Sequence, residues 1–193
     1  MASRNQLVKA KARSQAGSSL LEVMIAGLVF STGLLGSMAL IVTAIANNNR
    51  SKMDSTATLI AQRTMERIAS VPANATATST PSSTVSIIDC NPNSSSATHS
   101  VNTLDSGGTG TGAPLSGGGI DFSTSTVTGY SMTYYACQTS TGQSGGNYDV
   151  RWYVKTLTAD AKLVVVAAEK TGTQTGHANN YLKPVSLRMI VGL

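Results

Sequence analysis

Residues 17–46 read GSSLLEVMIAGLVFSTGLLGSMALIVTAIA, and this stretch decides the fold of the N-terminal part of the chain. Its one charged residue is Glu22, and residues 23–46 carry no charge at all. As an α-helix, which rises 1.5 Å per residue, the uncharged run is about 36 Å long, slightly more than the hydrocarbon core of a bilayer. The stretch therefore predicts a helix that can cross a membrane.

Basic residues precede this run with no acidic residue among them, namely Arg4, Lys9, Lys11 and Arg13. This distribution predicts a cytoplasmic N-terminus, with everything after the run on the far side of the membrane. The chain has 14 basic and 9 acidic residues, a net charge of +5. Without the leader, ten basic residues face nine acidic ones, so the rest is nearly neutral and nucleic acid is not indicated as a partner.

Two plain alternatives account for the apolar run. It can be an uncleaved anchor, or a secretory signal peptide, because the Ala-Ile-Ala sequence at 44–46 fits a small-residue cleavage site. Its length argues against the signal peptide, whose apolar region is roughly 7 to 15 residues long. The helical pattern also continues beyond Ala46.

The junction between leader and apolar run, GSSLLEVMI at 17–25, is more specific. It resembles the prepilin peptidase site of type IV pilins and type II secretion pseudopilins. The resemblance implies cleavage after Gly17, methylation of the new amine on Ser18, and Glu22 as the fifth residue of the mature chain. The family usually has a large apolar residue, often Phe, where this chain has Ser18. Residues 18–45 and 148–152 look closest to PilV-type minor pilins.

The position of Glu22 has a physical reason in that family. An ionised carboxylate near the centre of a bilayer costs on the order of 2.5 to 3.5 kcal/mol. Cleavage would offset this by creating a cationic amine one helical turn away, and the helix dipole favours negative charge in the first turn. In a filament the partner could be the amine of a neighbouring subunit, which would set axial register. The alternative is a glutamate at the interface beside a plain anchor.

Small residues recur inside the apolar run. Gly27 and Ser31, and Gly33 and Ser37, are four positions apart, a spacing that lets helices approach closely. Packing in a filament core would use this spacing, and ordinary membrane-helix glycine explains it equally well.

The rest of the chain predicts a helix followed by a sheet. We expect an amphipathic helix over 47–72, which Pro72 should end near Val71. A Ser/Thr/Gly-rich loop region is expected over 73–126, where it should add little core and have strand character only at 85–88. An antiparallel sheet should occupy 127–193. Its strands are expected around 130–136, 150–154, 163–168 and 185–191. The predicted fold class is α+β and pilin-like, with leader 1–17 and a membrane or filament-core helix over 18–46.

Two cysteines, Cys90 and Cys137, fall in the part expected outside the cytoplasm, where a disulfide persists. The alternative is two separate buried thiols. No Cys-x-x-Cys pair or neighbouring histidine supports a metal site.

Enzymatic activity is not expected. Residues 142–146 match G-x-S-x-G, but a strand pattern follows the serine where a nucleophile elbow needs a helix. We expect no catalytic residues, metal or cofactor. The predicted function is that of a minor pilus subunit, with a minor pseudopilin of type II secretion as the alternative.

The resemblance also implies partners and a location. The partners are prepilin peptidase, other pilin subunits, the inner-membrane assembly machinery and, before assembly, membrane lipid. The chain would lie in the inner membrane before assembly and in an extracellular pilus at the cell surface afterwards.

Overall fold

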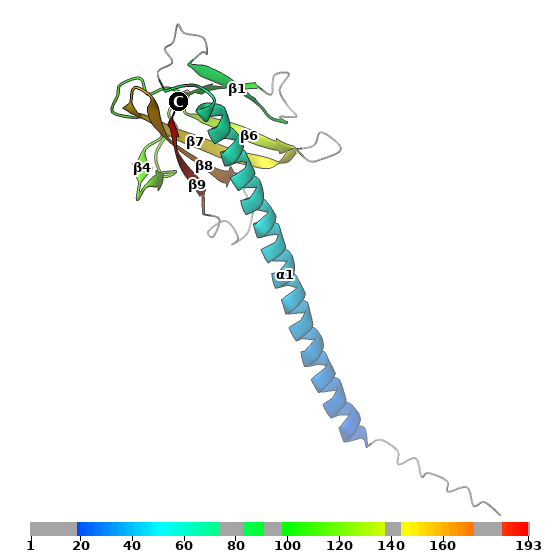
Figure 1. Cartoon of the computed structure of the whole chain (residues 1–193). Helices are drawn as coiled ribbons and strands as arrows, with labels where there is room; N and C mark the ends of the chain where they lie inside the picture. Colours follow the sequence, from blue (N-terminus) through cyan, green and yellow to red (C-terminus); the bar gives the residue numbers. More distant parts are fainter. Residues whose placement is uncertain (1–18, 74–82, 91–97, 138–143, 172–182, 193) are drawn as a thin grey trace, which may run out of the picture. The chain divides into compact units, whose positions relative to one another are not determined.

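The computed structural model describes residues 19–73, 83–90, 98–137, 144–171 and 183–192 (Figure 1). The chain forms two compact units, Met1–Asn47 and Asn48–Leu193. The predicted leader, residues 1–17, lies outside the described residues. One long N-terminal apolar helix and an antiparallel sheet confirm the predicted α+β layout.

Helix α1, Leu20–Ala69, is 50 residues long and continues through both halves of the predicted helix. It ends two residues before Val71, the residue that Pro72 restricts. In its second half the buried residues recur at three- and four-residue steps, as an amphipathic helix requires. They are Ala57, Ile60, Ala61, Thr64 and Ile68.

The main sheet is antiparallel throughout and contains all four predicted strands. They are β6 (Ser131–Cys137), β7 (Ser144–Thr158), β8 (Ala161–Thr171) and β9 (Val185–Gly192). β7 pairs with β8 along one edge, and β8 pairs with β9. Along its other edge β7 pairs first with β6 and then with the short β3 (Thr111–Gly112).

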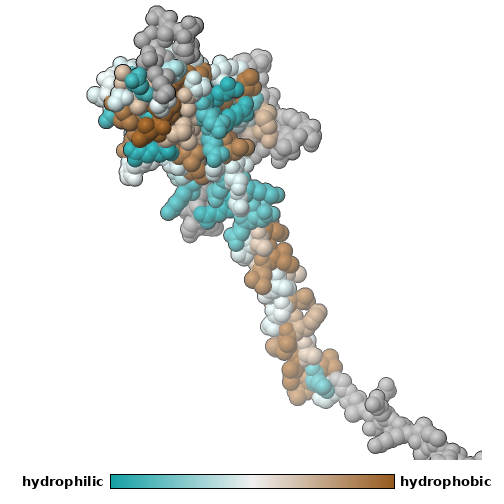
Figure 2. Space-filling model, in the orientation of Figure 1, coloured by the Kyte–Doolittle hydropathy of each residue, from teal (hydrophilic) through white to brown (hydrophobic). Residues whose placement is uncertain are grey.

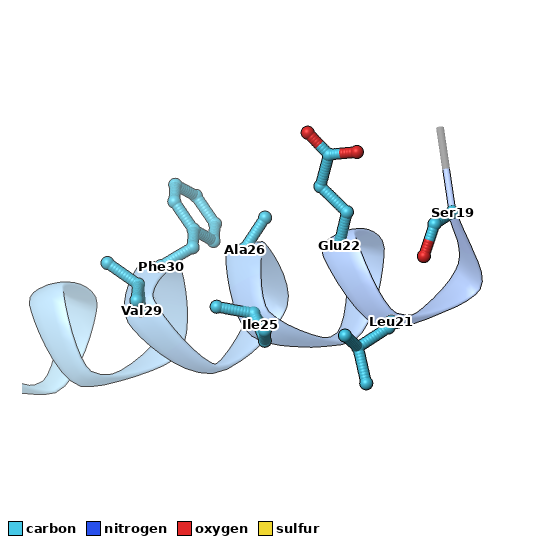
Figure 3. Close-up of a pocket in the computed structure, with 7 residues that line it drawn as sticks. All are labelled: Ser19, Leu21, Glu22, Ile25, Ala26, Val29 and Phe30. Carbon is cyan, nitrogen blue, oxygen red and sulfur yellow. The ribbon is translucent and has the colours of Figure 1, made fainter. Parts of the chain in front are cut away.

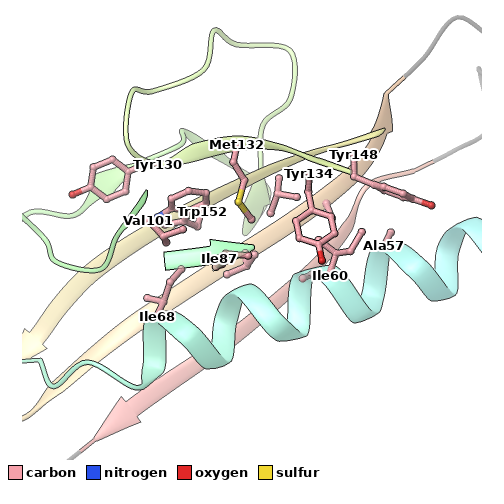
Figure 4. Close-up of a cluster of buried hydrophobic side chains, with 14 of the residues drawn as sticks. Ala57, Ile60, Ile68, Ile87, Val101, Tyr130, Met132, Tyr134, Tyr148 and Trp152 are labelled. Carbon is pink, nitrogen blue, oxygen red and sulfur yellow. The ribbon is translucent and has the colours of Figure 1, made fainter. Parts of the chain in front are cut away.

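The core of the second unit lies between α1 and one face of this sheet (Figure 4). Alternate residues of each strand face the helix, as the period of two in a strand requires. Tyr148, Val150, Trp152 and Val154 of β7 are all buried. The Trp152 indole Nε1 donates a hydrogen bond to the Asn102 carbonyl oxygen at 2.9 Å.

The opposite face of the sheet is covered by the segment that carries β4 (Leu115–Ser116) and β5 (Gly119–Ile120). A second apolar cluster forms there from Ala113, Ile120, Leu163, Val165 and Ala167. β8 is therefore buried on both faces, which explains why residues 163–168 are apolar without alternation.

The predicted strand character at 85–88 is confirmed by β1, but the prediction that residues 73–126 otherwise form a loop region with little core was wrong. They include β1 (Thr84–Ile88) and β2 (Thr98–Asn102), which pair antiparallel, as well as β3, β4 and β5. Ile87 and Val101 are fully buried in the main core. Apart from β1, each of these strands offers at most one apolar side chain, too few for a periodic signal, and tertiary contacts stabilise them.

Gly112 in β3 is required by a close approach of two strands. Its φ is 126°, in the region that favours glycine. The backbone amide of the next residue, Ala113, donates a hydrogen bond to the Trp152 carbonyl oxygen at 2.9 Å. A Cβ on Gly112 would collide with that same carbonyl oxygen. The glycine therefore lets β3 pair with the end of β7.

Candidate functional site

The N-terminal end of α1 places the predicted assembly residue in the first helical turn. Ser19 precedes the helix, and its carbonyl oxygen accepts hydrogen bonds from the amides of Glu22 at 2.9 Å and Val23 at 3.3 Å. The order Ser-x-x-Glu at 19–22 is that of a capping box. Because three or four backbone amides at this end have no helical partner, the carboxylate of Glu22 is favoured there.

The predicted cleavage and methylation residues, Gly17 and Ser18, lie outside the described residues. Within the described part of the chain, no basic side chain pairs with Glu22. The amine that cleavage would place on Ser18 stays a prediction.

The residues around Glu22 form two parallel rows on the helix (Figure 3). Glu22, Ala26 and Phe30 are spaced by four, and so are Leu21, Ile25 and Val29. Residues four apart lie above one another on a helix. Figure 3 shows the carboxylate of Glu22 projecting away from the axis, with apolar side chains next along its row. A single carboxylate thus begins an otherwise apolar helix face.

The first half of α1 is apolar on all sides and uncovered within the chain. Every residue from Ser19 to Lys52 is exposed, and Figure 2 shows the surface of the first half to be largely hydrophobic. The mean hydropathy of its most apolar window is 2.1, so the helix is long and apolar enough to cross a membrane. Burying one large apolar side chain is favourable by about 1.5 to 3 kcal/mol, so a surface of this size favours contact with lipid or with other helices.

Polar groups inside the apolar half are satisfied locally. The hydroxyl groups of Ser31 and Ser37 donate to carbonyl oxygens three residues earlier, and that of Thr43 to one four residues earlier. These bonds lower the cost of placing hydroxyl groups in hydrocarbon. A Cβ at Gly27 or Gly33 would meet nothing within 4 Å, so these glycines leave open notches on the helix surface.

The predicted disulfide is present and joins Cys90, just after β1, to Cys137 at the end of β6. The Cα atoms are 5.2 Å apart. Beside it, the buried carboxylate of Asp89 accepts hydrogen bonds from His99 Nε2 and from the Tyr135 amide, both at 2.9 Å. The bridge and these bonds fasten the β1–β2 hairpin to the main sheet.

A buried lysine that the sequence reasoning missed holds the end of α1. Lys162 Nζ donates to the carbonyl oxygens of Ile68 at 2.8 Å, Val71 at 2.7 Å and Thr103 at 3.2 Å. The side chain is 1% exposed. Burial lowers the pKa of Lys162 to about 8, whereas the three carbonyl acceptors, one of them in the last turn of α1, favour the charged form.

A signal for Lys162 was present in the sequence. It stands two positions before Val164, so strand alternation places it on the face toward α1. A lysine in that position can only be buried with acceptors around its ammonium group. Strand alternation predicts the face on which Lys162 lies. It does not predict the acceptors, because they belong to segments about 60 to 90 residues away in the sequence.

Arg151, which the sequence reasoning also missed, joins two segments on the opposite face of the sheet. Its Nη2 lies 2.7 Å from Asp149 Oδ2, its Nη1 donates to the Thr124 carbonyl oxygen at 2.7 Å, and the guanidinium lies over the Phe122 ring at 4.8 Å. It thereby ties the segment after β5 to β7.

Comparisons with known proteins add no functional information, since no protein-family model, curated protein or solved structure matches this chain.

Proposed function

We propose that this chain is a minor structural subunit of a type IV pilus, cut after Gly17 by prepilin peptidase and assembled through the first half of α1. The observation that carries the proposal is the build of α1. One half is apolar on every side and uncovered, with a single carboxylate in its first turn, and the other half packs on an antiparallel sheet.

Each part of this helix has a use in a filament. The uncovered apolar half would lie in the inner membrane before assembly and among the same halves of other subunits afterwards. Glu22 would pair with the methylated amine of a neighbouring Ser18, so a subunit out of register would leave a charge unpaired in an apolar core. The sheet domain, held by its disulfide, would then face the outside of the cell.

The first experiment determines the mature N-terminus by mass spectrometry of the purified chain. We expect it to begin at Ser18 with a methylated amine, and replacing Gly17 by Leu should leave the basic leader attached. The second compact unit begins at Asn48, close to the alternative signal-peptide site after Ala46. A mature chain beginning at Asn47 would therefore reject the pilin proposal.

The second experiment tests the role of Glu22 with a matched control. Glu22→Ala should still be cleaved and stay in the membrane, because the change does not reduce the apolarity of the helix, but it should be missing from sheared filaments. Glu66→Ala removes a carboxylate from an exposed position in the second half of the same helix and should be incorporated normally. Incorporation of both variants at wild-type level would remove the register role from Glu22.

The pseudopilin alternative predicts the same cleavage and the same effect of Glu22→Ala. Deletion of the gene separates the two. Loss or shortening of surface pili with normal protein secretion supports the pilus subunit, and loss of secretion with normal pili supports the pseudopilin.

A further inference from the structure

A hollow in the second unit is lined by donors from three elements. It has a volume of about 400 Å³ and lies between the first turns of α1 after Asn48 and the ends of β6, β7 and β8. Five of its lining residues carry side-chain hydrogen-bond donors. They are Asn49, Lys52, Thr56, Tyr148 and Lys170.

Two lysines from different elements line the hollow. Asn49, Lys52 and Thr56 follow one another at steps of three and four, which places them on one face of α1. Lys170 is the register partner of Tyr148 across the β7–β8 pair. Figure 4 shows the hydroxyl of Tyr148 at the Ala57 end of the buried cluster, away from Ile68.

The chemistry of this lining selects an anion. No carboxylate is among the lining residues, and the remaining ones, Met53, Ala136 and Cys137, are apolar. Within the described residues neither Lys52 nor Lys170 forms an ion pair. Burial and, to a lesser extent, the carboxylate of Asp54 raise the pKa of Tyr148, and one carboxylate against two lysines leaves the lysines in excess. Two ammonium groups with amide and hydroxyl donors suit phosphate oxygens.

The position of Lys52 along the helix indicates where that phosphate comes from. Lys52 follows Ala46, the last residue of the uncharged run, by six positions, or about 9 Å of helix. Headgroups extend roughly 5 to 8 Å beyond the hydrocarbon core, and a lysine stem can reach back toward them. Lys52 can therefore reach the level of lipid phosphate when the run spans a bilayer.

We propose that this hollow binds the phosphate headgroup of an anionic phospholipid before assembly. Lys52 and Lys170 contact the phosphate oxygens, and Asn49 and Tyr148 supply hydrogen bonds. The Thr56 hydroxyl already donates to the Lys52 carbonyl oxygen at 2.9 Å and serves only as part of the wall. The proposal requires only that residues 23–46 span the membrane, so it does not depend on the pilus assignment.

The test measures amine reactivity of the full-length chain in nanodiscs, with acylation of each lysine followed by mass spectrometry. Adding phosphatidylglycerol to phosphatidylcholine discs should slow the labelling of Lys52 and Lys170 about fivefold and leave Lys155, at the other end of β7, unchanged. Equal labelling of Lys52 and Lys170 in the two kinds of disc would overturn the proposal.

Two variants separate a built site from general attraction to a charged surface. Lys170→Gln should abolish the protection of Lys52, because the two lysines share one phosphate, whereas Lys155→Gln makes the same charge change elsewhere and should preserve it. Protection of Lys52 at the wild-type level in Lys170→Gln discs would show a surface effect only and would reject the site.

Two further arms distinguish other anions. If inorganic phosphate added to phosphatidylcholine discs protects both lysines equally well, the hollow is a site for free anions and the lipid is rejected. If protection in phosphatidylcholine discs rises with the number of chains per disc, a second copy of this chain occupies the hollow, and the lipid is again rejected.

Discussion

Replacing Lys162 by methionine tests how the end of α1 is held to the sheet. Methionine has a similar length and is apolar, so the change removes three hydrogen bonds with little change in volume. It leaves the carbonyl oxygens of Ile68, Val71 and Thr103 without this donor. Each buried acceptor without a donor costs about 1 to 3 kcal/mol, and part of the desolvation cost of the charge is recovered, so we expect a net loss of about 2 kcal/mol.

The assay is urea unfolding of the full-length, oxidised chain in detergent, followed by tryptophan fluorescence. Trp152 is the one tryptophan of the chain and is fully buried beside the same segment, so its emission reports this domain. Lys155→Met, at a half-buried position on β7, is the control and should change the free energy of unfolding by less than about 0.5 kcal/mol.

The dependence on pH gives an independent check. The pKa of Lys162 is about 8 in the folded chain, below its ordinary value of 10.5. Between these two values the unfolded chain binds more protons than the folded chain, so the free energy of unfolding should rise with pH from 8 to 10.5. This rise should be missing in Lys162→Met. A variant as stable as the wild type at pH 7 would refute the reasoning. Desolvation of the ammonium group would then destabilise the fold as much as its hydrogen bonds stabilise it.

Three other predictions concern the second unit. Labelling of the unfolded, unreduced chain should detect no free thiol at Cys90 or Cys137, and two labelled cysteines would contradict the bridge. Reduction should lower the free energy of unfolding by about 4 kcal/mol, because the disulfide closes a loop with a sequence separation of 47. Gly112→Ala should lower the free energy of unfolding by about 2 kcal/mol or more in the same urea assay. The control Gly107→Ala should be nearly neutral, because the backbone geometry there is ordinary and the added Cβ would lie 3.7 Å from its nearest neighbour. Equal effects of the two variants would argue against the close approach of β3 and β7. A fragment of residues 48–193 should give a mixed helix and strand circular dichroism spectrum, because its core lies within the second unit, and a disordered spectrum from the oxidised fragment would show that the core needs the apolar half of α1.

Local patterns in the sequence were sufficient for the elements with strong periodicity. The uncharged run and the three- and four-residue steps after it determine α1, and Pro72 determines its end to within two residues. Alternation determines β6, β7 and β9, and a short apolar run determines β8. In each case the signal lies within the element, since helix and strand periods depend on neighbours along the chain. The identity of the N-terminal site is also a matter of sequence, because it rests on Gly17, Ser18 and Glu22 and their spacing.

Tertiary structure alone decided what depends on residues far apart. The β1–β2 hairpin is ordered because Ile87 and Val101 are buried in the core, and nothing within the β2 segment indicates its strand. Cys90 and Cys137 could have been two separate thiols until folding brought them together. The acceptors of Lys162 and the donor-lined hollow around Lys52 and Lys170 are each assembled from several elements. Burial and charge pairing are properties of the packed chain, so one-dimensional patterns can name the face on which such a residue lies but not the groups that it meets there.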